Sequence, residues 1–300
     1  MTSPRTILNS MDLQAKKQLG QNFLSDPSTA EMIVSRARIC ASDTVLEIGP
    51  GLGALTFPLA RYARQVIAVE KDHRIAGILK TLIASSQFSH VTIIENDILK
   101  VNVNDIADQA GHPLVVMGNL PYNISSQVLI QLIQNRKAVS RAILMFQKEL
   151  AERITSDPGV KDYGRITVML KYCADVSTIA TVKSHLFFPK PKVDSEVVEI
   201  RFKTHLPMPA NDEVFLSRVI QASFGKRRKT LKNALSSSSL GISVQLTEKA
   251  LACAFIIPSR RAETLSIEEF VALSNCLGNL INDESPDFEA RPDRFLTAVP

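Results

Sequence analysis

From about residue 43 to residue 150, short apolar runs alternate with segments whose apolar residues recur at helical spacing. The apolar runs are Thr44–Gly49, Gln65–Glu70, Val91–Glu95, Pro113–Gly118 and Ala142–Phe146. Between them lie patterns such as Leu129, Leu132 and Ile133, which share one helix face. This alternation predicts an α/β fold whose parallel sheet carries helices on both faces.

The chain after residue 192 changes character. Residues 193–203 alternate in their second half and predict a further strand that closes an edge of the sheet. Pro207 and Pro209 then interrupt the pattern, and we place a domain boundary there. Helical spacing resumes, with a capping-box signature at Ser266 and Glu269. We expect a catalytic domain at 1–204, a helical domain at 205–282 and a disordered tail at 283–300.

Composition excludes several classes of protein. Hydrophobic residues make up 45% of the chain, but no run reaches the ~18 apolar residues of a membrane span. No apolar block follows the first charged residues as a signal peptide requires, so we expect a cytoplasmic protein. The cysteines are scattered without a C-x-x-C pair, which favours buried reduced thiols over a zinc site. They are Cys40, Cys173, Cys253 and Cys276.

The balance of charge is modestly basic. The formal net charge is +5 and the pI is about 9.0, which fits a nucleic-acid partner without requiring one. The strongest local cluster is the run from Lys226 to Lys229, followed by Lys232. A short basic run is also common on an ordinary solvated surface.

A glycine-rich turn follows the first predicted strand and opens a helix. Gly49, Gly51 and Gly53 give the spacing G-x-G-x-G, whereas a dinucleotide fingerprint requires G-x-G-x-x-G. Glu47 places a carboxyl group where a pyrophosphate would lie. The turn therefore disfavours NAD and suits a cationic or zwitterionic ligand.

Polar side chains end the next three strands. Glu70 can accept hydrogen bonds from both hydroxyls of a ribose, and Asp97 can accept one from an exocyclic amine such as adenine N6. Asn119 follows the fourth strand. The carboxyl ends of parallel strands meet at one edge, so this set predicts a site for a ligand with an adenine, a ribose and a charged tail. S-adenosylmethionine fits that description.

The sequence Asn119-Leu-Pro-Tyr122 lies where the sulfonium methyl would be. The side-chain oxygen of Asn119 and the carbonyl of Leu120 can accept both hydrogens of an adenine amine, which frees the nitrogen lone pair. Pro121 fixes φ and so aims that carbonyl. Tyr122 offers a stacking surface for a base that has left its own stack. Catalysis would then rest on positioning and hydrogen bonding.

Five stretches together resemble the rRNA adenine N6,N6-dimethyltransferases of the KsgA (RsmA) type. They are KKQLGQNFL at 16–24, EIGPGLGALT at 47–56, NLPYNIS at 119–125, FQKELAER at 146–153 and FFPKPKVDS at 187–195. The resemblance extends from about residue 13 to residue 278. It implies a Rossmann-like, seven-stranded S-adenosylmethionine-dependent methyltransferase sheet with a smaller C-terminal helical domain.

The resemblance also implies a reaction and its residues. The family dimethylates two adjacent adenosines in a hairpin loop near the 3′ end of 16S rRNA, in the immature 30S subunit. Its cofactor contacts correspond to Asn22, Leu24, Gly49, Gly51, Glu70, Asp97 and Asn119, and its catalytic segment to Asn119, Leu120, Pro121 and Tyr122. The extension before residue 12 receives no role, and we expect a monomer without a metal.

Candidate RNA contacts rest partly on charge and partly on the resemblance. Aromatic residues beside lysines suit a flipped base and its phosphate, although a proline-rich turn explains the same residues. The basic run suits the rRNA backbone. The candidates are Phe187, Lys190, Lys192, Lys226, Arg227, Arg228 and Lys229.

Three other interpretations stay open. A 23S rRNA adenine methyltransferase of the macrolide-resistance type shares the sheet and most of the motifs. A non-catalytic ribosome assembly factor could use the same fold, but the intact glycine turn and Asn119 argue against it. An NAD-dependent dehydrogenase is disfavoured by the glycine spacing.

Overall fold

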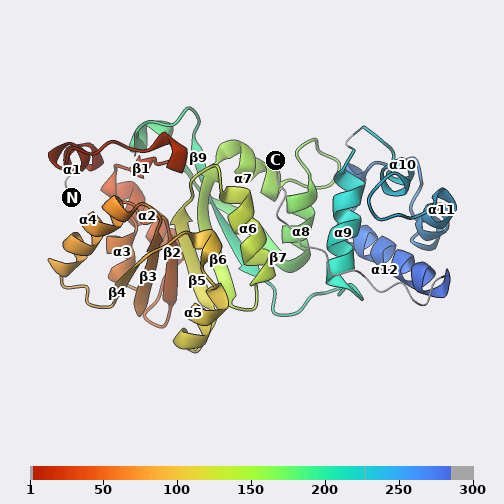
Figure 1. Cartoon of the computed structure of the whole chain (residues 1–300), viewed down its shortest axis with the longest axis horizontal. Helices are drawn as coiled ribbons and strands as arrows, with labels where there is room; N and C mark the ends of the chain where they lie inside the picture. Colours follow the sequence, from red (N-terminus) through yellow and green to blue (C-terminus); the bar gives the residue numbers. More distant parts are fainter. Residues whose placement is uncertain (1–2, 227, 285–300) are drawn as a thin grey trace. The chain divides into compact units, whose positions relative to one another are not determined.

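The computed structural model describes residues 3–226 and 228–284 (Figure 1). The chain divides into two compact units. The first contains the residues up to 151 together with 175–202, and the second contains 152–174 together with the residues from 203 onward. Of the tail expected to be disordered, residues 285–300 lie outside the described residues. No helix in the described part of the chain has the length and apolar character needed to cross a membrane.

The first unit is built on a seven-stranded sheet with the order β4-β3-β2-β5-β6-β9-β7. Its strands are β2 Thr44–Ile48, β3 Gln65–Glu70, β4 Val91–Glu95, β5 Leu114–Asn119, β6 Val139–Gln147, β7 Ala174–Val182 and β9 Ser195–Phe202. Strands β2 to β6 pair in parallel, and β9 runs antiparallel to β6. All five strands predicted from the apolar runs are confirmed.

The part of the sheet beyond β6 differs from the prediction. The strand expected at 193–203 is present as β9, but it lies between β6 and β7 rather than at an edge. The edge position belongs to β7, which the sequence analysis did not identify. An edge strand with one exposed side carries more polar residues, and β7 reads ADVSTIATV. Its weak apolar signal explains why it was missed.

Helices cover both faces of the sheet. They are α2 Pro27–Ala37, α3 Thr56–Ala60, α4 His73–Ala84, α5 Val103–Ala110 and α6 Ser125–Gln134, with short 3-10 turns η2 Ile98–Lys100 and η3 Ser184–Leu186. Residues of α2, α3 and α4 share one core with Val45, Val115 and Ile143. The alternate residues Leu46 and Val116 are fully buried as well, so the opposite face is also covered.

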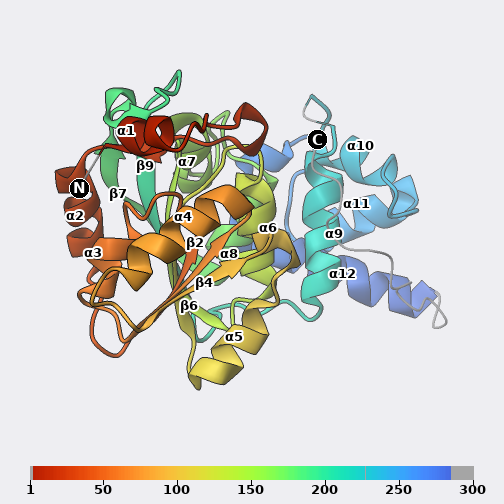
Figure 2. The same ribbon diagram turned by 60° about the vertical axis from the view of Figure 1, so that its left-hand side comes forward.

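The N-terminal segment packs onto this unit (Figure 2). Helix α1, Pro4–Ser10, buries Leu8 against Leu52 and Ile75. After the 3-10 turn η1, Lys17–Leu19, strand β1, Phe23–Leu24, pairs antiparallel with β8, Phe187–Phe188. The segment that precedes the first strand of the sheet is therefore an integral part of the first unit.

The second unit is helical. Helix α7, Lys148–Thr155, leads into it, and its other helices are α8 Arg165–Cys173, α9 Glu213–Phe224, α10 Leu231–Ser236, α11 Val244–Cys253 and α12 Ile267–Glu284, with a 3-10 turn η4 at Ala262–Thr264. The predicted capping box is confirmed. The Ser266 N–H donates to Glu269 Oε2 at 2.8 Å, and the Glu269 N–H donates to Ser266 Oγ at 3.3 Å.

The domain boundary expected at residue 204 is only one of the boundaries between the units. The chain first passes from the first unit to the second at residue 152. Residues 152–174 belong with the C-terminal helices, and the chain then returns to the first unit for β7, β8 and β9. The reason lies in packing, since the Tyr172 hydroxyl accepts the Ala210 N–H at 3.1 Å and donates to Glu213 at 3.3 Å. These contacts join segments that are about 40 residues apart in the sequence.

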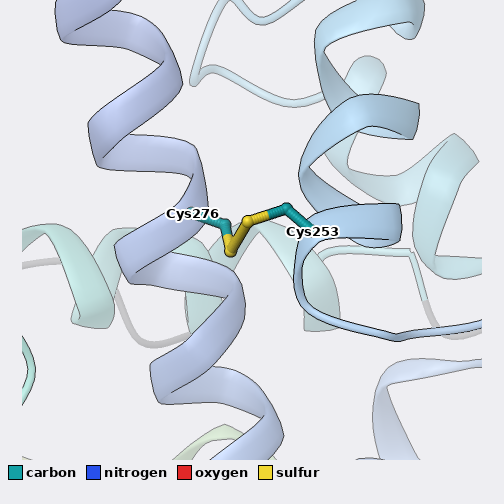
Figure 3. The surroundings of a disulfide bond; sticks show 2 residues. All are labelled: Cys253 and Cys276. Carbon is teal, nitrogen blue, oxygen red and sulfur yellow. A yellow bond between two sulfur atoms is a disulfide. The ribbon is translucent and has the colours of Figure 1, made fainter.

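The cysteines also depart from the prediction. Cys253 in α11 and Cys276 in α12 form a disulfide, whereas four reduced thiols were expected (Figure 3). The two helices pack side by side and bring the Cα atoms to 6.1 Å, a normal span for such a bond. Cys40, which is exposed, and Cys173, which is buried, do not take part in a disulfide. The bonded pair is separated by 23 positions in the sequence, and no local motif reveals it.

Candidate active site

A cavity of about 330 Å³ opens in the first unit, at the carboxyl ends of β2, β3 and β5. This is within the size range of small-molecule sites. Every residue predicted to bind cofactor or to act in catalysis lines it. They are Asn22, Leu24, Gly49, Gly51, Glu70, Asp97, Asn119, Leu120, Pro121 and Tyr122. The structure therefore brings together residues that lie as much as 100 positions apart.

The glycine turn forms one wall of the cavity. Gly51 has a φ of +57°, a left-handed conformation that favours glycine. A Cβ atom at this position would lie only 3.0 Å from the ring of Phe23 in β1. The Gly51 N–H donates to Glu70 Oε2 at 3.1 Å. The turn thus fixes both the cavity wall and the carboxylate at the end of the neighbouring strand.

Glu70 is held by backbone donors at the end of β3. Its Oε2 accepts from Gly51 and its Oε1 accepts the Asp72 N–H at 2.9 Å. Each carboxylate oxygen can accept a second hydrogen bond, so the group can still bind two neighbouring hydroxyls. Burial raises the pKa of Glu70 above its usual value, and the two backbone donors offset part of that rise.

Asp97 ends the turn after β4. Lys71 Nζ lies 2.7 Å from its Oδ2, and the Leu99 N–H donates to its Oδ1 at 3.1 Å. Burial acts to raise the pKa of Asp97, but Lys71 and the Leu99 amide outweigh it and hold the pKa below its usual value. Asp97 is therefore an ionised acceptor at neutral pH, suited to an amine hydrogen.

Glu47 lies on β2 beneath the glycine turn and is only 1% exposed. Its Oε2 makes no hydrogen bond in the described part of the structure. Burial raises the pKa of Glu47 to about 8, with a further contribution from the charge of Glu70. Since Glu47 is mostly neutral at pH 7 when no ligand is bound, its charge alone does not exclude a pyrophosphate. The glycine spacing is then the feature of the turn that disfavours NAD.

Asn119, at the end of β5, is fixed in one orientation. Its Nδ2 donates to the backbone carbonyl of Asn22 at 2.8 Å. This assigns the nitrogen to the N-terminal segment and leaves Oδ1 as the remaining acceptor. Among the described residues, no donor reaches Asn119 Oδ1 or the carbonyl oxygen of Leu120. The two acceptors required to bind an amine are therefore both available.

Gly118 makes this placement possible. A Cβ atom here would lie 2.5 Å from the carbonyl oxygen of Ile48 on β2. Only glycine lets β5 approach β2 so closely at the register Ile48 opposite Gly118. No role was predicted for Gly118 from the sequence, although it directly precedes Asn119.

Tyr122 is half-buried on the cavity wall. Its hydroxyl lies 3.4 Å from Ser195 Oγ at the start of β9, and burial raises the pKa of Tyr122 above its usual value. The hydroxyl therefore stays protonated and tethers one end of the ring. A tethered aromatic ring on a cavity wall is suited to stacking rather than to proton transfer.

Asp72 is a residue that the sequence analysis missed. It is buried at the start of α4 and binds the N-terminal segment, with Gln21 Nε2 at 3.2 Å and Lys16 Nζ at 3.4 Å. Hydrogen bonds from Arg74 are the main cause that lowers the pKa of Asp72 far below its usual value. Its partners Gln21 and Lys16 lie more than 50 positions away in the sequence, so no local pattern identifies them.

The N-terminal extension also reaches the cavity. Pro4 and Ile7 of α1 line it, and Arg5 lies over the ring of Phe188 at 5.8 Å from the centroid. No role was predicted for this extension from the sequence. Its apolar side chains are too few to predict a wall from sequence.

The predicted RNA contacts are divided between the two units. Phe187 is 4% exposed and packs in the core of the first unit, so it has no free face for a base, and that prediction is wrong for this structure. Lys190 and Lys192 are exposed nearby. In the second unit, Lys226, Arg228 and Lys229 are exposed, and Arg227 lies outside the described residues.

Comparison with solved structures gives the class of protein. A dimethyladenosine transferase from Plasmodium falciparum is similar over 84% of this chain and 95% of that one, with a TM-score of 0.69 and 27% identity. The 23S rRNA methyltransferase ErmE is similar over 85% and 99%, with a TM-score of 0.65 and 25% identity. The fold is the Rossmann-like fold of rRNA adenine methyltransferases.

Sequence comparison gives the family. The model of the ribosomal RNA adenine dimethylase family matches residues 12–278. A protein named ribosomal RNA small subunit methyltransferase A from Desulforapulum autotrophicum is 51% identical over 95% of this chain and 99% of its own length. One of the same name from Bacillus mycoides is 38% identical over 91% and 94%. The chain belongs to the ribosomal RNA adenine dimethylase family.

Proposed function

We propose that this protein transfers methyl groups from S-adenosylmethionine to N6 of two adjacent adenosines in a hairpin loop near the 3′ end of 16S rRNA. The substrate would be the immature 30S subunit, and the reaction would contribute to small-subunit biogenesis. The observation that carries the proposal is the orientation of Asn119, whose nitrogen binds Asn22 and whose oxygen is left as an acceptor in the cavity. Membership of the family supports it independently.

The residues present fit S-adenosylmethionine. Glu70 would accept the ribose hydroxyls, and Asp97 would accept an adenine amine hydrogen. Asn22, Leu24 and the glycine turn would complete the walls. Buried Glu47 also lines the cavity, and its Oε2, which makes no hydrogen bond in the described structure, offers a further polar group toward the ligand. When bound, the group supplies an electrophilic methyl.

The chain's own part in the reaction is to prepare the adenine amine. Asn119 Oδ1 and the Leu120 carbonyl would accept its two hydrogens, so the nitrogen lone pair is less delocalised into the ring. Pro121 fixes the direction of that carbonyl, and Tyr122 would hold the base by stacking. The displaced proton passes to solvent, since no side chain with a suitable pKa is needed to take it. Charge stabilisation and positioning carry the rate enhancement.

The choice of the small subunit rests on relatives that share nearly the whole chain. ErmE also has a similar fold, so the fold alone does not select the target. Purified protein incubated with immature small and large subunits and labelled S-adenosylmethionine separates the two. We expect label in the 16S rRNA. Label in the 23S rRNA alone would overturn the choice of target.

A role as a non-catalytic assembly factor is the alternative from another class. The intact glycine turn, Glu70 and Asn119 argue against it, because a protein that only binds RNA does not require the residues of a methyl-donor site. We further propose that the protein acts as a monomer in the cytoplasm. Its second unit would bind rRNA through exposed cations that include Lys226, Arg228 and Lys229.

Replacing Glu70 by alanine is expected to weaken S-adenosylhomocysteine binding by about 10- to 100-fold, because one carboxylate would accept two hydroxyls and hydrogen bonds to charged groups contribute roughly 1.5–3 kcal/mol. Glu95→Ala is the matched control. Glu95 also ends a strand at this edge but lies near Lys80 at 3.8 Å and does not line the cavity. Calorimetry with S-adenosylhomocysteine and with NAD measures both variants. Equal losses of S-adenosylhomocysteine affinity in the two variants would contradict the assignment. So would an unmodified protein that binds NAD more tightly than S-adenosylhomocysteine.

Replacing Ile7 by alanine tests the contribution of α1 to the same cavity. We expect S-adenosylhomocysteine to bind a few-fold more weakly, since the removed methylene groups are worth about 1 kcal/mol when a ligand covers them. Met11→Ala is the control, because Met11 is 55% exposed and does not line the cavity. An unchanged dissociation constant for the Ile7 variant would show that α1 has only a structural role.

A further inference from the structure

Helix α11 ends in an unusual way. The Phe255 N–H donates to the Ala252 carbonyl at 3.1 Å, and the Ile256 N–H donates to the Leu251 carbonyl at 2.8 Å. This pair of hydrogen bonds defines a Schellman turn, in which the residue after the helix cap adopts the left-handed conformation. Glycine is the usual residue there. In this chain it is Phe255, with a φ of +56°.

Packing does not compensate for the strained backbone of Phe255. Its side chain is 95% exposed, more than any other large apolar residue in the described part of the chain. Ile257, two residues on, is 63% exposed, whereas Ile256 between them is 3% exposed and anchors the turn. Strained residues that stability does not favour are concentrated at functional sites. We call residues 255–257 the aromatic tip.

The aromatic tip is held firmly on both sides. Immediately before it, Cys253 is joined to Cys276 of α12 by the disulfide (Figure 3). Immediately after it, the carbonyl of Arg260 accepts the Leu231 N–H at 2.7 Å and the carbonyl of Pro258 accepts the Lys232 N–H at 3.4 Å. The phenylalanine ring is therefore presented to solvent from a fixed base.

The hydrogen bonds that Leu231 and Lys232 donate to the segment after the aromatic tip place the tip beside the basic run. Helix α10 begins at Leu231, directly after Lys226, Arg228 and Lys229, which are exposed. Between Glu213 and Glu248 the sequence contains no acidic residue. Three acidic residues of the neighbouring segments are paired with cations: Glu248 with Lys232 at 3.0 Å, Glu263 with Arg261 at 3.9 Å, and Glu269 with Arg260. The exposed cations of the basic run therefore have no acidic residue beside them in the sequence.

We propose that Phe255 is a base-stacking residue through which the second unit contacts an unpaired base of ribosomal RNA, while Lys226, Arg228 and Lys229 bind the flanking phosphates. An exposed aromatic ring beside cations is the usual arrangement for single-stranded nucleic acid, because the ring stacks on a base and the cations bind the backbone. A hydrophobic protein partner would suit the ring alone but would leave the cations without opposite charges. This inference rests on the proposed partner, the immature small subunit.

The test compares the full-length protein with its Phe255→Gly and Phe255→Tyr variants. Glycine relieves the left-handed strain, so we expect Phe255→Gly to raise the midpoint of thermal unfolding by about 2–4 °C. The same change removes the stacking ring, so its dissociation constant for immature small subunits should rise by about 5- to 100-fold at fixed salt. Phe255→Tyr keeps an aromatic ring and should bind like the unmodified protein. Opposite effects on stability and binding are not expected of a structural residue.

Two results would overturn the inference. One is unchanged affinity of Phe255→Gly for the particle, measured with an unmodified protein that binds and methylates it. The other is a photo-crosslink from benzoylphenylalanine at position 255 to a ribosomal protein, whereas a crosslink to rRNA supports stacking. If the unmodified protein neither binds nor methylates the small subunit, the proposed function itself fails.

Discussion

Replacing Asn119 by alanine is expected to reduce methyl transfer by about 10²–10³-fold, the usual effect of removing one group that stabilises a transition state by hydrogen bonding. The physical reason is the loss of the Oδ1 acceptor that draws electron density toward the adenine amine. Affinity for small subunits should remain, because binding depends on other surfaces. Single-turnover rates with labelled S-adenosylmethionine, together with dissociation constants for the particle, separate the two effects.

Asn123→Ala provides the matched control for this experiment. Both side chains bind the N-terminal segment, Asn119 through the Asn22 carbonyl at 2.8 Å and Asn123 through the Gln18 carbonyl at 3.5 Å. Only Asn119 ends β5 at the proposed reaction centre. If the tether to the N-terminal segment were the whole role of Asn119, the two variants would lose similar activity. Undiminished turnover by Asn119→Ala would refute the mechanism.

The second large effect concerns Glu47 and pH. Burial raises the pKa of Glu47 from 4.5 to about 8, so the folded protein retains a proton there that the unfolded chain has lost. Stability from this group is therefore fully present below about pH 4.5 and declines as pH rises toward 8. The slope approaches about 1.4 kcal/mol in unfolding free energy per pH unit in that window. Glu47→Gln keeps the neutral shape and should remove the slope.

Denaturant unfolding of the ligand-free protein between pH 5.5 and 8.5 measures this directly, as the difference between the unmodified protein and Glu47→Gln. Using the difference cancels titrations that Glu47 does not influence, such as that of Asp72. The unmodified protein should lose stability relative to the variant as pH rises. Parallel curves would show that Glu47 is ionised throughout, and its raised pKa would be wrong.

Much of the fold and cavity could be predicted because each signal is local. A buried parallel strand reads as an apolar run in the sequence. The polar residues at the carboxyl ends of such strands lie at one edge of the sheet, whatever the lengths of the loops that connect them. Glu70 and Asn119 each end such a run and Asp97 closely follows one, so their meeting in one cavity follows from the alternation alone. The family motifs then supplied Asn22 and Leu24, which no strand pattern would have revealed.

What could not be predicted depends on partners distant in sequence. The pairing of Asp72 with Lys16 and Gln21 joins segments more than 50 residues apart. Strand β7 returns from the second unit to the sheet with an alternating, polar sequence. Phe187 reads as an exposed aromatic beside lysines, yet its antiparallel pairing with Leu24 carries it into the core. Phe255 shows the reverse case, an apolar residue that the helix end turns outward.

The most direct test of the whole account is mass mapping of N6-methylated adenosines in 16S rRNA from cells that lack this protein, with and without the gene restored. We predict that two adjacent adenosines in a hairpin loop near the 3′ end are unmodified in its absence and become N6,N6-dimethylated when it returns. An identical pattern of methylation in both kinds of cell would contradict the account.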